Sequence, residues 1–75
     1  MDQITKNKIA QCLAMSMEIE GATFMHSSNN QTVNVYKIEN GVQVWSHKAF
    51  HNLGSLDELM NDLSKYITYE NLKNG

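Results

Sequence analysis

An Asn40-Gly41 pair between two alternating segments constrains this chain more than any other feature. Both central residues of a two-residue type I′ turn need positive φ, and asparagine followed by glycine meets that need best. We therefore predict a β-hairpin over residues 32–48 that turns at this pair. A turn at this position pairs Tyr36 directly with Trp45.

The alternation of the hairpin assigns its side chains to two faces. One face is β-branched and consists of Val33, Val35, Val42 and Val44. The other is an aromatic pair in polar surroundings and consists of Asn34, Tyr36, Ile38, Gln43, Trp45 and His47. We expect the valine face to pack against helices. The aromatic face has the composition of protein interfaces, so it is the candidate partner-binding site.

A helix is expected before the hairpin, over residues 2–20. Asp2 is placed to act as its N-cap, and Gly21 is placed to end it in a left-handed conformation. The buried stripe of this helix is predicted along Ile9, Leu13 and Met17, with Cys12, Ser16 and Ile19 beside it. A first strand is predicted over residues 22–27, followed by a polar turn.

A second helix is expected to begin at Ser55, because Ser55 and Glu58 have the spacing of a capping box. Its apolar stripe is predicted at Leu56, Leu59, Met60, Leu63, Tyr66 and Ile67. From about residue 69 the chain becomes a polar C-terminal tail, although Tyr69 and Leu72 could continue the stripe for one more turn.

These elements predict an α+β fold of order α-β-β-β-α. It is a three-stranded antiparallel meander sheet with two helices packed on one face, and residues 1–75 form a single small domain.

The lone Cys12 excludes an intramolecular disulfide, and no apolar run has the length of a membrane span or a signal peptide, so we expect a cytoplasmic protein. The many Asn, Lys and Ile residues, with no Pro or Arg, suggest an AT-rich coding sequence, compatible with a low-GC bacterium, its plasmids or its phages. Such a setting suits a phage- or plasmid-encoded modulator or inhibitor of a host protein.

Nucleic-acid binding is disfavoured by charge. The net charge is −2, and all six basic residues are lysines, whereas arginine supplies most bidentate phosphate and base contacts. Double-stranded-RNA-binding domains share the predicted order of elements, but they need cations at the start of the last helix. This chain has Asp57 and Glu58 there, so we exclude that family. Lys37 and Lys48 are expected on the valine side, away from the aromatic face.

No catalytic, cofactor or metal motif is recognised. His47 and His51 are four residues apart, but they are expected at a strand end and in a loop, and His26 lies on another strand. We therefore expect isolated polar histidines and no metal or cofactor. The acidic residues are expected on solvated helix faces, so no enzyme activity is expected.

The sequence thus predicts a small non-enzymatic protein-interaction module that binds a protein, or a second copy of itself as a homodimer, through the face around Tyr36 and Trp45. Two alternatives remain open. The same face could bind single-stranded nucleic acid, or the protein could be a purely structural homodimer with no other ligand. In place of an interface, the face could also be a minor core that the N-terminal segment or the tail around Tyr69 and Leu72 covers.

Overall fold

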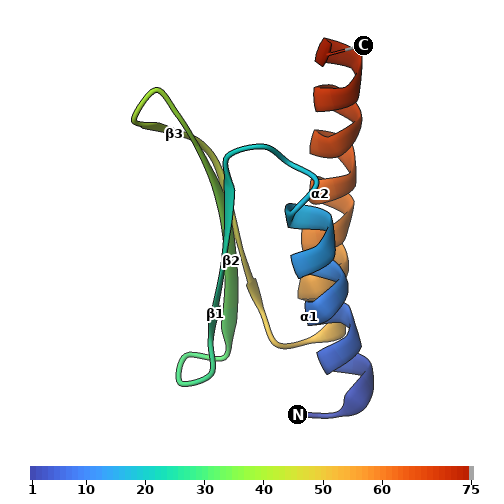
Figure 1. Ribbon diagram of the computed structural model, residues 1–75. Helices are drawn as coiled ribbons and strands as arrows, with labels where there is room; N and C mark the ends of the chain where they lie inside the picture. Colours follow the sequence, from blue (N-terminus) through green and yellow to red (C-terminus); the bar gives the residue numbers. More distant parts are fainter. Residues whose placement is uncertain (75) are drawn as a thin grey trace.

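The predicted α+β architecture is confirmed by a computed structural model that describes residues 1–74. Its elements are α1 (Gln3–Ser16), β1 (Ala22–Ser27), β2 (Thr32–Glu39), β3 (Val42–Phe50) and α2 (Leu53–Asn74). The strands form one antiparallel sheet in the order β1-β2-β3. Figure 1 shows this sheet as one layer and the two helices side by side as a second, so one face of the sheet has no covering element.

The hydrophobic core fills the space between the two layers. Its buried members are Cys12, Ile19, Val33, Val35, Ala49, Leu56, Leu59 and Leu63. The leucines of α2 follow the predicted three- and four-residue spacing, and the two valines of β2 form the floor beneath them. None of the helices in residues 1–74 combines the length and apolarity that crossing a bilayer requires.

The Asn40-Gly41 turn is confirmed, but the pairing beyond it is not the predicted one. Both residues have positive φ, 52° and 78°. Glu39 pairs with Val42 and Ile38 with Gln43, after which Lys37 pairs with Trp45, so Val44 is left over as a β-bulge. This extra residue shifts every later residue of β3 to the opposite face.

The prediction that Tyr36 lies opposite Trp45 is therefore wrong, since Tyr36 pairs with Ser46. The physical reason is burial. The bulge turns the Trp45 ring toward the helices and leaves Val44 48% exposed. An aromatic side chain removes far more apolar surface from water than a valine does, and this gain offsets the disrupted ladder.

The helix α1 begins as predicted and ends earlier. The Asp2 carboxylate accepts a hydrogen bond from the Thr5 amide at 2.7 Å, so Asp2 is the N-cap. The last helical residue is Ser16, and its buried face lies along Thr5, Cys12 and Ser16. Two members of the predicted stripe, Leu13 and Met17, are 42% and 77% exposed. The early end allows the following turn to bring Ile19 into the core.

Gly21 has positive φ, as predicted, but it serves the entry to β1 and does not cap α1. A Cβ at this position would lie 3.2 Å from the backbone oxygen of Ile38. The Ile38 amide also donates to the Gly21 carbonyl at 3.4 Å. Glycine is therefore needed both for φ and for this close approach of two backbones.

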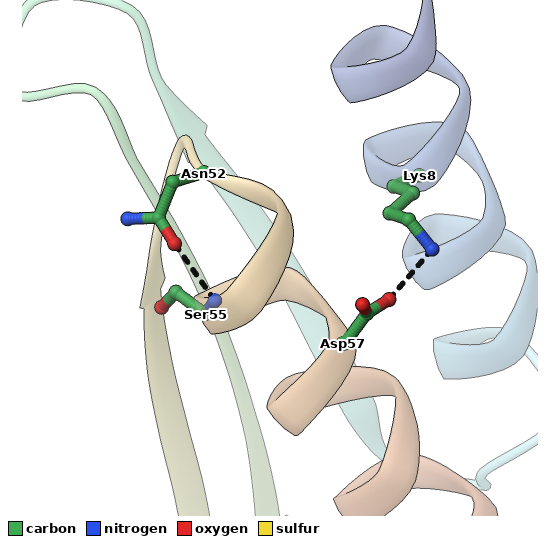
Figure 2. A network of polar contacts seen from close by, with 4 residues as sticks. All are labelled: Lys8, Asn52, Ser55 and Asp57. Carbon is green, nitrogen blue, oxygen red and sulfur yellow. Dashed lines mark hydrogen bonds and ion pairs between the residues drawn. The ribbon is translucent and has the colours of Figure 1, made fainter.

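The start of α2 corrects the predicted capping box. The Asn52 side-chain oxygen accepts from the Ser55 amide at 2.8 Å, so Asn52 is the capping residue and the helix begins at Leu53 (Figure 2). The Ser55 hydroxyl instead accepts from the Phe50 amide at 2.9 Å and joins the helix to the end of β3. The spacing of Ser55 and Glu58 predicts the wrong cap. Asn52, three residues before Ser55, also has a side-chain oxygen that can accept from a free amide at the helix start.

The predicted polar tail is also corrected, because α2 continues as helix to Asn74. Two contacts with the sheet stabilise its C-terminal half. The Tyr66 ring lies 5.4 Å from the Trp45 ring, and Glu70 Oε1 lies 2.6 Å from Lys37 Nζ. Tertiary contacts here override a local sequence that is largely polar.

Lys37 is a buried cation in the centre of the sheet, on the valine side as predicted. Its residue is 4% exposed, and its ammonium also lies 3.3 Å from Glu39 and 5.6 Å from the centre of the Tyr66 ring. The hydrogen bond to Glu70 raises the pKa of Lys37, so the amine stays charged at neutral pH. The other lysine expected on this side, Lys48, pairs with Asn34 and lies on the uncovered face, so that prediction is wrong.

We predict that Asn52→Ala lowers the free energy of unfolding by about 1 kcal/mol, because the Ser55 amide loses its acceptor at the helix start. Urea titration followed by circular dichroism measures the change. Asn61→Ala, on the exposed face of the same helix, is the matched control and should change stability by less than about 0.5 kcal/mol. Equal effects of the two substitutions would contradict the assignment of Asn52 as the cap.

We predict that Cys12 is almost inert toward alkylation in the folded protein. The thiol is fully buried, and burial raises its pKa from an ordinary value of 9.0 to about 11. At pH 8 this shift alone lowers the thiolate fraction about 100-fold, and only the thiolate reacts. Iodoacetamide labelling followed by mass spectrometry should therefore be at least about 100-fold slower than in urea-unfolded protein. Equal rates would show that the thiol is accessible.

Candidate interaction surfaces

The six residues predicted to form one site lie on two sides of the sheet. Four of them stay together on the face without helices: Asn34, Tyr36, Ile38 and Gln43. Trp45 and His47 lie on the helix side, since they pair with the buried residues Lys37 and Val35. The geometry of a single aromatic face is therefore wrong, and the six residues divide between two surfaces.

The first surface, called here the uncovered sheet face, is formed by the outward side chains of all three strands. By strand pairing it comprises Thr23, Met25, Ser27, Thr32, Asn34, Tyr36, Ile38, Gln43, Ser46, Lys48 and Phe50. Met25 on β1 and Phe50 on β3 are each 55% exposed, and Ile38 is 40% exposed. Apolar side chains thus stand at both edges of the face, and Asn34 and Tyr36 lie between them on the central strand.

Lys48 gives the uncovered sheet face its charge. Among the strand residues assigned to this face, Lys48 is the single basic side chain, and none of the others is a carboxylate. Its ammonium lies 5.8 Å from the centre of the Phe50 ring, in a cation–π contact. Beside it is a hollow of about 230 Å³ whose lining includes Met25, Asn34 and Lys48. The face therefore combines apolar anchors, an amide and one cation.

The second surface, called here the Trp45 groove, lies between β3 and α2. It is an open hollow of about 440 Å³ lined by Trp45, Asp62, Lys65, Tyr66 and Tyr69. The three aromatic rings follow one another, with centroids 5.4 Å apart from Trp45 to Tyr66 and 5.7 Å apart from Tyr66 to Tyr69. The aromatic partner of Trp45 is thus a helical tyrosine that the sequence pattern assigned to the core.

His47 lies beside the Trp45 groove and is hydrogen-bonded to Asp62, one of the residues that line it. Its Nδ1 lies 2.7 Å from Asp62 Oδ2, where both side chains remain partly exposed. Because the pair is solvent-exposed, its contribution to stability is small. Asp62 is therefore not a free acidic side chain on a solvated face, as the helix pattern suggested.

The expectation of three isolated histidines is wrong for His26 and His51. Their Nε2 atoms are 3.0 Å apart, and their ring centroids are separated by 4.8 Å. Spacing along the chain drew attention to His47 and His51, yet the pair that forms is 25 residues apart. Pairing of β1 and β3 with the same central strand could have indicated it, because His26 and Ala49 both lie opposite Val33.

A surface ion pair also links α1 to α2. Lys8 Nζ lies 2.6 Å from Asp57 Oδ1 (Figure 2). One of the two carboxylates near the start of α2 is thus paired within the protein. Both side chains are partly exposed, so the pair orients the two helices more than it stabilises them.

Comparison with protein-family models, with curated proteins and with solved structures finds no match to this chain.

We predict that Trp45→Ala lowers the free energy of unfolding by about 2–3 kcal/mol. This is less than the loss from a fully buried tryptophan, because Trp45 is half-buried. Urea titration by circular dichroism measures the loss. Trp45→Phe keeps a ring against Tyr66, so it should retain more than half of the stability that Trp45→Ala removes. A Trp45→Ala protein as stable as the parent would show that the groove contributes nothing to the core.

Proposed function

We propose that this protein is a small non-enzymatic interaction module that binds another protein through the uncovered sheet face. The observation that supports this proposal best is the combination of exposed Met25, Ile38 and Phe50 on a face that neither helix covers. Apolar and aromatic side chains around a polar centre are the usual composition of the buried part of a protein interface.

The size of the face indicates the class of contact. Three strands at about 4.8 Å and six residues at about 3.3 Å give a projected area of roughly 300 Å². A standard interface buries about 800 Å² on each partner. A contact limited to this face is therefore in the small, transient class, or else the partner extends over the β3 edge, where Val42 and Val44 are exposed.

Charge favours a partner other than a second copy. The uncovered sheet face carries Lys48 and no carboxylate, so a copy of the same face offers no counter-ion for that ammonium. A partner with an apolar patch and one acidic side chain satisfies both parts of the face. We therefore propose a different protein with such a patch as the occupant, and self-association becomes an outcome of the test.

Single-stranded nucleic acid is a second candidate, since Lys48 lies on this face together with Tyr36 and Phe50. Aromatic rings that stack on bases beside a cation are the usual elements of such sites. One lysine on a chain of net charge −2 provides little phosphate attraction, so protein binding is the stronger proposal. From the composition we also propose that the protein is cytoplasmic and encoded by a phage or a plasmid.

The test is site-specific cross-linking in cells. A benzophenone amino acid at Phe50 should give one protein adduct of defined mass, and the same group at the exposed Met17, just after α1, should give none. Lys48→Glu should lower the yield at least 10-fold, because it places a carboxylate against the acidic side chain of the partner. Lys6→Glu on α1 makes the same charge change away from the face and should leave the yield unchanged.

Three outcomes would contradict the proposal in different ways. Equal adducts from both positions, or none from Phe50, would remove the uncovered sheet face as an interface. An adduct at twice the mass of the chain, together with a dimer by light scattering, would assign the face to a second copy. Fluorescence quenching by a 15-nucleotide poly-dT strand that Tyr36→Ala abolishes would assign it to single-stranded DNA.

A further inference from the structure

The two paired histidines occupy one corner of the fold, where His26 also lines the hollow beside Lys48 on the uncovered sheet face. His26 is near the end of β1, and His51 is the first residue after β3, just before α2. Their rings are tilted by 34°, and the Nε2 atoms face each other at 3.0 Å. Two imidazole nitrogens from distant parts of the chain thus converge on one point.

The separation of the two nitrogens matches a chelate. Imidazole nitrogens bind transition metals at about 2.0–2.1 Å. Two such bonds to atoms 3.0 Å apart enclose an angle of about 95°, which suits neighbouring positions of a square-planar or octahedral ion. A tetrahedral ion such as zinc would need about 3.3–3.4 Å with the same bond lengths.

The Nε2 atom of each ring faces the other ring, so an ion held by both histidines binds through Nε2. In a neutral imidazole one ring nitrogen is an acceptor, and that nitrogen is the one that binds a metal ion.

The surroundings favour a particular ion. The histidines line a hollow of about 330 Å³ together with Met1, Ser28 and Gln31, which carry thioether, hydroxyl and amide oxygen groups. Within residues 1–74, no set of three His, Cys, Asp or Glu side chains converges. A site of two imidazoles without carboxylate or thiolate is unsuited to Ca²⁺ or to structural zinc. Among divalent ions, Cu²⁺ binds nitrogen ligands most tightly and accepts tetragonal geometry.

We propose that His26 and His51 bind one Cu²⁺ ion through their Nε2 atoms, with water and the neutral groups of the hollow in the remaining positions. In the metal-free protein the two nitrogens share one hydrogen bond, which the ion replaces. The ion then links the end of β1 to the residue before α2. This inference does not depend on the proposed protein-binding function.

The test is a Cu²⁺ titration of the full chain, followed by electron paramagnetic resonance and by thermal unfolding. One equivalent should give a tetragonal Cu²⁺ spectrum with coupling to two nitrogens, and Tm should rise as the site fills. His26→Gln and His51→Gln should each weaken binding at least 10-fold. His47→Gln removes a histidine that is paired with Asp62 and should bind as the parent does.

A second measurement keeps the proposal testable if a variant fails to fold. Bound Cu²⁺ should protect His26 and His51 of the parent protein from diethyl pyrocarbonate, mapped by mass spectrometry, and should leave His47 unprotected. Copper binding that survives both substitutions, or equal protection of all three histidines, would overturn the site. Tighter binding of Zn²⁺ than of Cu²⁺ would overturn the choice of ion.

Discussion

The extra residue at Val44 determines which side chains the helices cover. Side chains alternate along a strand, so one unpaired residue exchanges the two faces for the rest of β3. Trp45, His47 and Ala49 therefore face the helices, and Lys48 and Phe50 face away from them. Both interaction surfaces, and the place of Ala49 in the core, follow from this single local choice.

Two contacts of different chemistry then secure the half of α2 that extends beyond α1. The contact between the tilted rings of Trp45 and Tyr66 is apolar, and the Lys37–Glu70 pair is charged and largely buried. A buried cation is costly without its partner, so the ion pair fixes the position of the helix more than it adds net stability. These two contacts fix how the C-terminal half of α2 lies against the sheet.

Local signals predicted the features that depend on neighbouring residues. The Asn40-Gly41 turn, the Asp2 cap and the order of elements require only backbone preferences and short-range hydrogen bonds. The bulge could not be predicted, because it depends on how much of Trp45 is buried against a tyrosine 21 residues later. Asn52 and Ser55 have nearly equal preferences for the N-cap position, so local preferences alone do not decide between them. The meeting of His26 and His51 depends on the register of three strands.

The contact between α1 and α2 has a consequence for how the protein folds during synthesis. Lys8 and Asp57 are separated by 49 residues, and the buried face of α1 around Cys12 is completed by α2. The strands that lie between them can pair through short loops, which close quickly. On the ribosome, α1 and the valine side of the sheet therefore stay exposed until α2 has emerged, and the core closes in one late step that brings together two segments made far apart in time.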